Sequence, residues 1–93
     1  MKFNIVGCGL SGIVAAVLLK EKGHSVEIFE TRKHIGGNCF DGLLNNIMVH
    51  QYGAHIFHTN DDEVWDFVNR YANFNSYTHR VRANTNQGNV SIP

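Results

Sequence analysis

The chain has 93 residues and a mass of 10.5 kDa, which allows one small domain and excludes a second full domain. Its composition is 43% hydrophobic, 11% aromatic and 17% charged with a single proline, which excludes a disordered or low-complexity chain. Eight basic and eight acidic residues give a net charge of +0, which excludes a broad basic surface for nucleic acid or an anionic membrane.

The N-terminal third of the chain predicts a strand, a helix and a second strand. Residues 3–6 form a short apolar run that ends at a glycine, as buried parallel strands do. Residues 10–22 are rich in Ala, Val and Leu and stop at Gly23, which is typical of a buried helix with a glycine C-cap. Residues 25–30 alternate in polarity and are rich in strand formers. We therefore expect an α/β, Rossmann-like βαβ unit with a right-handed crossover.

A loop and a hairpin are expected after this unit. Residues 31–38 show no strand or helix period and contain the pair Gly36-Gly37. A hairpin turn is predicted next, at either Asp41-Gly42 or Asn45-Asn46. Both dipeptides suit a tight turn, so the register of the hairpin stays open at this stage.

A further helix and terminal strands follow. Asn60 is the expected N-cap, with Glu63 three residues later. The apolar residues that share one helical face are Val64, Phe67, Val68 and Tyr71. This stripe predicts a helix of about three turns. Residues 76–85 alternate as a strand does, and residues 86–89 predict a turn into a last strand at residues 90–93.

A glycine motif joins the first strand to the first helix. Gly7, Gly9 and Gly12 form a G-x-G-x-x-G string at this junction, and Glu30 ends the next strand 18 residues after Gly12. In dinucleotide-binding folds the three glycines permit a tight turn, close approach of the pyrophosphate and close packing of the helix on the sheet. The sequence therefore predicts a dinucleotide site at this junction.

The residues around the glycine motif narrow the choice of nucleotide. Backbone N–H groups of the first helical turn, which includes Leu10 and Ser11, are expected to hold the phosphates. Glu30 is placed to accept hydrogen bonds from ribose hydroxyls and to repel a 2′-phosphate, which disfavours NADP. No Gly-Lys-Ser/Thr follows, which excludes a P-loop. The alternative is that the glycines form a plain structural turn and Glu30 is a solvated strand end.

The second glycine pair favours FAD over NAD. Gly36 and Gly37 follow Glu30 after five intervening residues, which resembles the extended motif of FAD-binding oxidases and reductases, whose second loop also contacts the diphosphate. Arg32 lies between them and supplies a charge-assisted donor for a phosphate. The alternative is that Arg32 is a solvent-facing cation and the glycine pair a plain loop.

Two longer strings give a more specific resemblance. Residues 34–38 (HIGGN) and 52–61 (YGAHIFHTND), with Trp65, resemble the N-terminal part of the UDP-galactopyranose mutase family. The similarity extends from Ile5 to about Pro93 without a gap. The family fold is a doubly wound FAD-binding domain with a helical domain and a further sheet. The resemblance therefore implies that residues 1–93 are an N-terminal FAD-binding portion that lacks the substrate-binding helical domain.

The resemblance also implies an activity. In this family N5 of reduced FAD attacks UDP-galactopyranose, displaces UDP, and the sugar recloses as UDP-galactofuranose. No side chain of these residues is then expected to be catalytic, because the nucleophile belongs to the flavin and the substrate-binding arginines lie outside the chain. NAD(P)H is the expected reductant, UDP-galactose the expected substrate partner, and a homo-oligomer stays open. These 93 residues alone are expected to be inactive.

The resemblance carries over to individual positions. The cofactor-binding residues that motif and resemblance together predict are Gly7, Gly9, Leu10, Ser11, Gly12, Glu30, Thr31, Arg32, Gly36, Gly37, Asn38, His55 and Ile56. By position, His79 and Ala83 are the predicted substrate-binding residues. Relatives often carry lysine where Thr31 stands, which should weaken one charge contact. His55 is expected to contact the flavin ring.

Metal binding and compartment are judged from the histidines and cysteines. His55 and His58 have a spacing that holds a metal if His50 joins them, but no cysteine or carboxylate ligand is placed nearby, so no metal is expected. Cys8 and Cys39 form neither a CxxC pair nor a disulfide framework, which indicates a reducing, cytoplasmic setting. No run approaches the ~20 apolar residues of a membrane span, and no signal peptide is visible.

Two other functions compete with the mutase. Another FAD enzyme, such as an amine-oxidase-like oxidoreductase, shares the pattern from Gly7 to Gly37 but gives no reason for the string at residues 52–59. A non-catalytic fragment that binds a nucleotide and turns nothing over is the third hypothesis. Flavin retention and conversion of UDP-galactofuranose separate the three.

Overall fold

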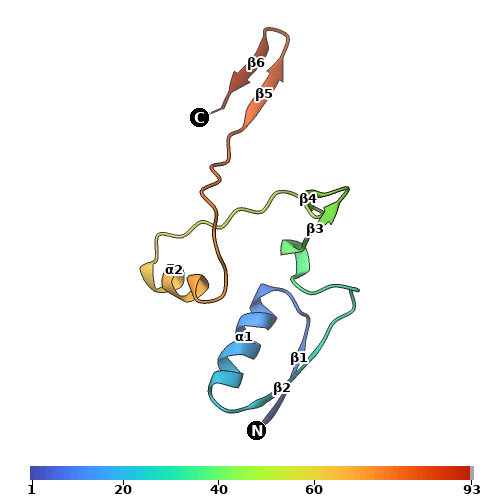
Figure 1. Ribbon diagram of the computed structural model, residues 1–93, viewed down its shortest axis with the longest axis vertical. Coiled ribbons are helices and arrows are strands. Elements are labelled where there is room, and N and C mark those ends of the chain that lie inside the picture. Colours follow the sequence, from blue (N-terminus) through green and yellow to red (C-terminus); the bar gives the residue numbers. More distant parts are fainter. Residues whose placement is uncertain (93) are drawn as a thin grey trace. The chain divides into compact units, whose positions relative to one another are not determined.

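A computed structural model describes residues 1–92, and Pro93, the end of the predicted last strand, lies outside the described residues. The chain divides into two compact units, Met1–His55 and Ile56–Pro93, and each is described by itself (Figure 1). In the part of the chain that the structure describes, no helix has the length and apolar character needed to cross a membrane.

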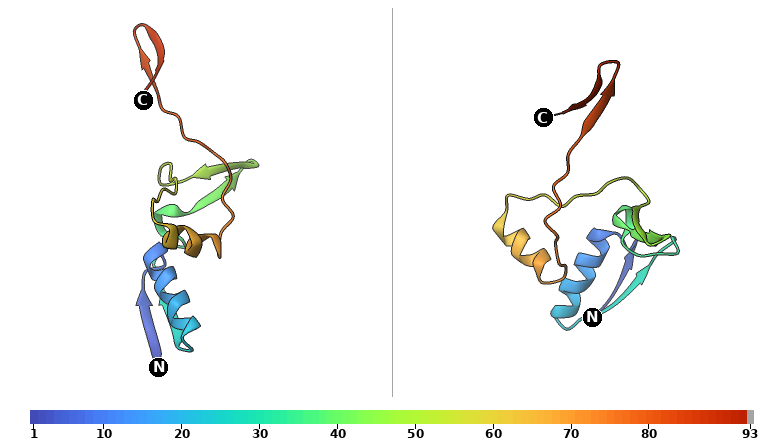
Figure 2. Two further views of the ribbon diagram at one scale, coloured as in Figure 1. Left: turned by 90° about the vertical axis from the view of Figure 1, so that its left-hand side faces the viewer. Right: turned by 45° about the horizontal axis from the view of Figure 1, so that its top comes forward.

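The first unit begins with the predicted βαβ unit. Its elements are β1 (Lys2–Val6), α1 (Leu10–Glu21) and β2 (Ser25–Phe29). The strands pair in parallel, with Phe3 opposite Val26 and Ile5 opposite Ile28. Both views of Figure 2 show α1 lying along this strand pair. The α/β, Rossmann-like fold class that the sequence predicted is confirmed for this unit.

Helix α1 packs through one face only. Alternate strand residues are partly buried, and Ile5 Cγ2 lies 3.4 Å from the position that a Cβ on Gly12 would take. Among the described residues only Cys8 and Ala16 are buried. The prediction of a helix buried all round is wrong for this chain, because the single strand pair covers one side. A stripe of apolar side chains on α1 therefore stays exposed: Leu10, Val14 and Leu18.

Helix α1 ends in the predicted glycine cap. Gly23 has a φ of +82°, a left-handed conformation that glycine adopts without a Cβ clash. Its N–H donates to Lys20 O at 2.9 Å, and the N–H of His24 donates to Leu19 O at 3.0 Å. This pair of bonds is a Schellman motif, which satisfies the last carbonyls of the helix and sends the chain directly into β2.

A hairpin completes the first unit. The predicted loop contains a short 3₁₀ turn, Gly37–Cys39, and leads into β3 (Asp41–Leu44) and β4 (Ile47–His50), which pair antiparallel. Asn45 and Asn46 form the turn with φ values of 50° and 65°. Asparagine tolerates this conformation, which matches the twist of a two-residue hairpin. Of the two predicted turns, the Asn45-Asn46 alternative is correct.

The second unit contains α2 (Asp62–Asn69) and a small aromatic cluster. The rings of Phe57, Trp65 and Phe74 contact one another, with centroid separations of 5.1 to 6.1 Å. The helix begins one residue later than predicted, because Asp61 rather than Asn60 is its N-cap. A carboxylate accepts two N–H groups here more strongly than an amide oxygen does.

Replacing Asp61 with alanine is expected to weaken α2 by about 1 kcal/mol. Its Oδ1 accepts from the N–H groups of Glu63 and Val64 at 2.9 and 3.1 Å, and alanine leaves both donors to water. Amide exchange of residues 62–65 measures the effect. Asp66→Ala is the control, because it places a better helix former at an exposed position of the same helix. Equal exchange in both variants contradicts the cap assignment.

The terminal strand is shorter than predicted. Residues 76–81 have no strand partner, and β5 (Arg82–Thr85) pairs antiparallel with β6 (Gly88–Ser91) around Asn86-Gln87. The alternation of residues 76–85 predicts one strand, but a strand needs a neighbour that supplies hydrogen bonds. In the described part of the chain, residues 82–85 pair with β6, and one more backbone bond, from the Ile92 N–H to Val81 O at 3.1 Å, lies before them. Of the two predicted substrate-binding residues, Ala83 therefore lies on β5, whereas His79 lies before it in irregular backbone.

Candidate functional site

The glycine motif forms a tight connection from β1 to α1. Gly7 has a φ of +97° and donates its N–H to Phe29 O at 2.7 Å, which ties the turn to the end of β2. Gly9 is the N-cap of α1, and its carbonyl accepts from Ile13 at 3.0 Å. The turn therefore delivers the chain directly from the carboxyl edge of the strand pair into the helix.

Gly12 and Gly9 have different tasks in this turn. A Cβ on Gly12 would overlap the carbonyl oxygen of Gly7, so the helix crosses the turn at a distance that only glycine permits. A Cβ on Gly9 would meet nothing within 4 Å. Gly12 therefore allows the helix to pack closely on the turn. Gly9 leaves open space in front of the backbone, as the sequence predicted for a pyrophosphate site.

The N-terminus of α1 is uncapped by side chains. Within residues 1–92 no side chain accepts from its first N–H groups, and its first turn holds no acidic residue. Leu10 and Ser11 lie in this turn beside Gly12. Backbone donors and the positive end of the helix dipole together make such a terminus an anion site.

The second glycine loop lies against the first. Gly36 donates its N–H to Cys8 O at 2.7 Å, and a Cβ on Gly37 would lie 3.0 Å from Gly9 Cα. The two loops are thus in backbone contact across 28 residues of sequence, counted from Cys8 to Gly36. The sequence predicted that both loops serve one diphosphate, and the structure brings them together.

Glu30 links three parts of the site. Its Oε2 accepts from the Cys8 N–H at 2.6 Å and its Oε1 from the Arg32 N–H at 2.8 Å, while Thr31 Oγ1 lies 3.4 Å from Oε1. Donation from the Arg32 and Cys8 backbones lowers the pKa of the Glu30 carboxyl from its usual value. The alternative of a merely solvated strand end is wrong, because this carboxylate fastens the glycine turn to the second loop.

Acidification is expected to loosen this junction. The folded state binds the proton of Glu30 less readily than the unfolded chain, so its stabilising contribution is complete above the ordinary Glu pKa of about 4.3 and is lost as the pH falls through the lower folded value. Amide exchange of Cys8 and Arg32 between pH 3 and 6 measures the loss. A Glu30→Gln chain should lack this pH dependence, and an unchanged profile in that variant contradicts the assignment.

Arg32 is held by two neighbours that the sequence did not single out for this purpose. Its Nη1 donates to Asn38 Oδ1 at 2.9 Å, and its guanidinium lies 4.6 Å from the ring centroid of Tyr52. His34 joins them: its Nδ1 lies 3.0 Å from Ile35 O and its Nε2 lies 2.6 Å from Tyr52 Oη. Because a carbonyl only accepts, His34 carries its proton on Nδ1 and accepts from the tyrosine hydroxyl.

Phe40 also supports the second glycine loop, because its ring stacks on that of His34 with the ring centroids 4.0 Å apart. Tyr52 and His34 lie 18 residues apart and belong to no shared helix or strand period. Periodicity therefore could not reveal their contact. The signal that marked them was only their place in the two strings that resemble the mutase family.

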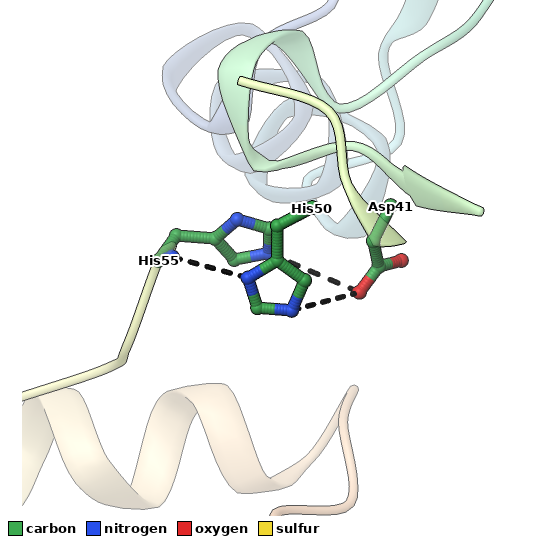
Figure 3. Close-up of side chains that lie close together, drawn as sticks. All are labelled: Asp41, His50 and His55. Atoms are coloured by element: carbon green, nitrogen blue, oxygen red, sulfur yellow. Dashed lines mark hydrogen bonds and ion pairs between the residues drawn. The ribbon is translucent and has the colours of Figure 1, made fainter. Parts of the chain in front are cut away.

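His55 lies at the end of the first unit, beside the hairpin (Figure 3). Its ring stacks on that of His50, with centroids 4.0 Å apart. Its Nδ1 is buried and finds no hydrogen-bond partner among the described residues.

The remaining predicted residues belong to the second unit. Ile56 is its first residue and is exposed. His79 lies in irregular backbone, with Nδ1 3.4 Å from Tyr77 Oη, and Ala83 lies on β5 opposite Val90. The described structure thus unites the predicted residues from Gly7 to Asn38, whereas Ile56, His79 and Ala83 stay predictions.

These residues fit the FAD that the sequence predicted. Open space in front of Gly9 and the uncapped terminus of α1 suit a diphosphate. A carboxylate offers about four acceptor positions. Glu30 uses them for Cys8, Arg32 and Thr31, which leaves capacity for a ribose hydroxyl. Arg32, fixed by Asn38 and Tyr52, adds a charged donor beside the second loop.

Comparisons with known proteins agree with this geometry. The chain is 48% identical over 94 residues to the dTDP-fucopyranose mutase of Escherichia coli, covering 99% of this chain and 25% of that protein. It is 47% identical over 91 residues to a probable UDP-galactopyranose mutase of Klebsiella pneumoniae, covering 96% of this chain and 24% of that protein. The resemblance predicted from residues 34–38 and 52–61 is confirmed, and the chain spans about a quarter of the length of these mutases.

A less extensive match and a family model were also found. The zeta-carotene desaturase of Synechocystis sp. is 43% identical over 60 residues, which cover 61% of this chain and 12% of that protein. The family model for the NAD(P)-binding Rossmann-like domain matches residues 5–71. That match takes in the end of β1, the rest of the βαβ unit, both glycine loops and α2, and the chain belongs to the NAD(P)-binding Rossmann-like domain family.

Proposed function

We propose that this chain is the FAD-binding part of a pyranose mutase that converts UDP-galactopyranose to UDP-galactofuranose. The observation that carries the proposal is the backbone contact between the two glycine loops, where Gly36 donates to Cys8 O and Gly37 lies against Gly9. Identity of 47–48% to two mutases over nearly the whole chain supports the choice of enzyme. The parts of the substrate site that these residues do not provide are proposed to lie in the other three quarters of such enzymes.

In this proposal the two loops hold the diphosphate. The N–H groups of Leu10, Ser11 and Gly12 donate to its oxygens, and the glycine backbones allow it to approach closely. Arg32 neutralises charge from the second loop, with Asn38 fixing its guanidinium. Thr31 provides no charge at the position where relatives of this family often carry lysine, so Arg32 is the main cation there.

Glu30 selects the nucleotide. Its carboxylate accepts from the ribose hydroxyls while its bonds to Cys8 and Arg32 keep it in place. A 2′-phosphate at the same position would meet a negative charge, so NADP is the disfavoured dinucleotide. The N–H groups of Arg32 and Cys8 lower the pKa of this carboxyl, so it stays ionised below the pH at which an ordinary glutamate takes up its proton.

The residues near the reacting centre are assigned in the same proposal. His55 and Ile56 contact the flavin ring, and His79 and Ala83 contact the sugar nucleotide. When bound and reduced, FAD supplies the nucleophile for this isomerisation through its N5 atom, so the chain itself needs no catalytic side chain. NAD(P)H is the proposed reductant, and the cytoplasm is the proposed compartment.

Titration of the purified chain with FAD tests the cofactor. Quenching of flavin fluorescence that saturates, with NAD and NADP binding at least tenfold more weakly, supports it. Conversion of UDP-galactofuranose under dithionite by the enzyme that carries this sequence tests the reaction, with dTDP-fucopyranose as the competing substrate because one mutase relative is named for it. FAD binding without either conversion overturns the mutase assignment, and failure to bind FAD overturns the cofactor.

A second candidate is an FAD oxidoreductase. The zeta-carotene desaturase relative supports it, since its 43% identity over 60 residues covers 61% of this chain. The match of the mutases over 96–99% of the chain favours the first candidate. Net oxidation of a substrate with flavin reduction, and no sugar isomerisation, would establish the second instead.

A further inference from the structure

The first unit contains two groups of histidine contacts near the hairpin. In the first group, the Nε2 atoms of His50 and His55 each lie 3.9 Å from Asp41 Oδ2, which is beyond hydrogen-bond reach (Figure 3). The sequence predicted no carboxylate here, but the two rings are stacked with planes 18° from parallel, so one metal ion cannot lie in both ring planes. In the second group, His34 Nε2 lies 2.6 Å from Tyr52 Oη. The second group therefore contains a hydrogen bond between side chains.

Tyr52 connects the end of the hairpin to the loop of residues 31–38. It lies two residues after β4, and it contacts His34 through its hydroxyl. The guanidinium carbon of Arg32 lies 4.6 Å from the centroid of its ring, within the range of a cation–π interaction. His34 and Tyr52 are also the first residues of the two strings that resemble the mutase family. This contact therefore gives both strings one physical task.

The hydrogen bonds of His34 have a defined direction. Its Nδ1 lies 3.0 Å from the carbonyl oxygen of Ile35, and because a carbonyl only accepts, Nδ1 carries the proton. Its Nε2 then accepts from the hydroxyl of Tyr52. The ring of Phe40 stacks on the ring of His34. The tyrosine ring is thus held at its hydroxyl end by a histidine that two further neighbours hold in place.

Arg32 is fixed on one edge and keeps its other donors free. Its Nη1 donates to Asn38 Oδ1 at 2.9 Å, and within residues 1–92 its side chain makes no other hydrogen bond or ion pair. Asn38 follows Gly37, where a Cβ would lie 3.0 Å from Gly9 Cα, so the guanidinium is tied to the point where the two glycine loops meet. An arginine that is already ordered loses less side-chain entropy when it binds a phosphate.

We propose that Tyr52 and His34 are positioning residues for the cofactor diphosphate and that they act on it through Arg32. This inference rests on the proposed function, which places the diphosphate at the two glycine loops. The tyrosine ring fixes the plane of the guanidinium, Asn38 fixes one edge of it, and His34 fixes the tyrosine. A residue beyond the hairpin therefore contributes to FAD affinity without touching FAD.

NMR of the arginine side chains in the full chain tests these contacts without any ligand. A ring that covers a guanidinium shifts the Hδ and Hε signals of that arginine upfield, so Tyr52→Leu should move the Arg32 signals to the values of an unstacked arginine. Tyr71→Leu is the matched control, because it removes a ring that lies 5.3 Å from the guanidinium carbon of Arg70, and it should leave the Arg32 signals unchanged. Arg32 signals that Tyr52→Leu does not move overturn the proposal.

Two variants of His34 isolate its hydrogen bond to the tyrosine. His34→Gln returns an acceptor near the place of Nε2 and His34→Leu does not, whereas both lose the ring stack on Phe40. His34→Leu should move the Arg32 signals toward the unstacked values, and His34→Gln should bring them back. Equal shifts in the two variants overturn the role of His34. The amides of Leu43 and Met48, which lie opposite each other on β3 and β4, report that the hairpin is kept.

A double-mutant cycle separates positioning from a general effect on stability. Tyr52→Leu is expected to weaken FAD binding by about threefold to tenfold, because the cation–π contact and the order that it gives the guanidinium are lost. In a chain that already carries Arg32→Gln, the same change should leave FAD affinity within about 1.5-fold, because the side chain that Tyr52 positions is gone. Equal losses in the two backgrounds overturn the proposal, since Tyr52 would then act on the fold or on FAD directly.

The two proposals fail in different ways. If the parent chain binds no FAD, the proposed function fails, whereas the Arg32 signals still decide whether Tyr52 and His34 hold the guanidinium. If the parent chain and Tyr52→Leu bind FAD equally well, the proposed cofactor stands and the positioning role is overturned.

Discussion

Replacing Gly12 with alanine is expected to abolish cooperative folding of the βαβ unit. The new Cβ would overlap the carbonyl oxygen of Gly7 and would lie 3.2 Å from its carbonyl carbon and 3.4 Å from Ile5 Cγ2. The first obstacle is backbone, which cannot rotate away as a side chain does. Overpacking typically costs about 1–3 kcal/mol and sometimes more. A unit in which Cys8 and Ala16 are the only buried residues among those described has little stability to lose.

The matched variant is Gly9→Ala in the same turn. Its Cβ meets nothing within 4 Å, and the backbone at Gly9 has a φ of −77°, which alanine adopts readily. We therefore expect Gly9→Ala to keep the parent melting curve and to weaken FAD binding by at least about tenfold, since its methyl group occupies the space proposed for the diphosphate. Circular dichroism melts and flavin titrations measure the two effects.

The pair separates packing from binding. Gly12→Ala should lose both the cooperative melting transition and the binding of FAD. Gly9→Ala should keep the melting transition and lose affinity for FAD. A Gly12→Ala chain that melts like the parent would show that α1 shifts to accommodate the methyl group. A Gly9→Ala chain that binds FAD normally would place the diphosphate elsewhere.

Changing Glu30 to glutamine is expected to weaken FAD binding by about tenfold to a hundredfold, the range for loss of a charged hydrogen-bond acceptor. The carboxylate accepts from Cys8 and Arg32 through different oxygens, and glutamine replaces one of these oxygens by an NH₂ group that faces a donor. The variant therefore loses a ribose acceptor and loosens one glycine loop at the same time.

Glu27→Gln is the control for this variant. Glu27 lies on β2, three residues before Glu30, and its carboxylate forms an exposed ion pair with Lys2 at 2.8 Å. Such surface pairs contribute little, so FAD affinity should stay within about twofold of the parent. Isothermal titration of the three chains with FAD compares them. Equal losses in Glu27→Gln and Glu30→Gln would show that strand charge, and not the ribose contact, governs affinity.

Local patterns along the chain were sufficient for much of the fold. The apolar run at residues 3–6, the helix that stops at Gly23 and the alternation of residues 25–30 predicted the βαβ unit with its bounds correct to about one residue. The glycine spacing predicted the turn to α1. These features depend on hydrogen bonds between near neighbours or on the period of one element, so the sequence carries them directly.

Features that depend on a partner were predicted less well. Residues 76–80 alternate like a strand, yet no strand in the described part of the chain pairs with them. Asn60 is of a residue type favoured at the N-cap, but Asp61 is the N-cap in the structure, where its side chain accepts from two N–H groups. Helix α1 is apolar all round, and only the face over the strands is covered. Strand pairing, helix capping and helix burial each depend on which other group contacts the residue in the folded chain. A local sequence pattern does not contain that information.

The sequence by itself determined that this protein has a Rossmann-like glycine turn, an acidic residue directly after β2 and a second glycine pair. Only the tertiary structure decided what those residues do to one another: that Glu30 binds the Cys8 N–H, that Gly37 rests against Gly9, that Tyr52 and His34 support Arg32, and that Asp41 faces both histidines. The reason is physical. A short-range period fixes an element, whereas a contact between distant residues exists only once folding has closed the loop between them.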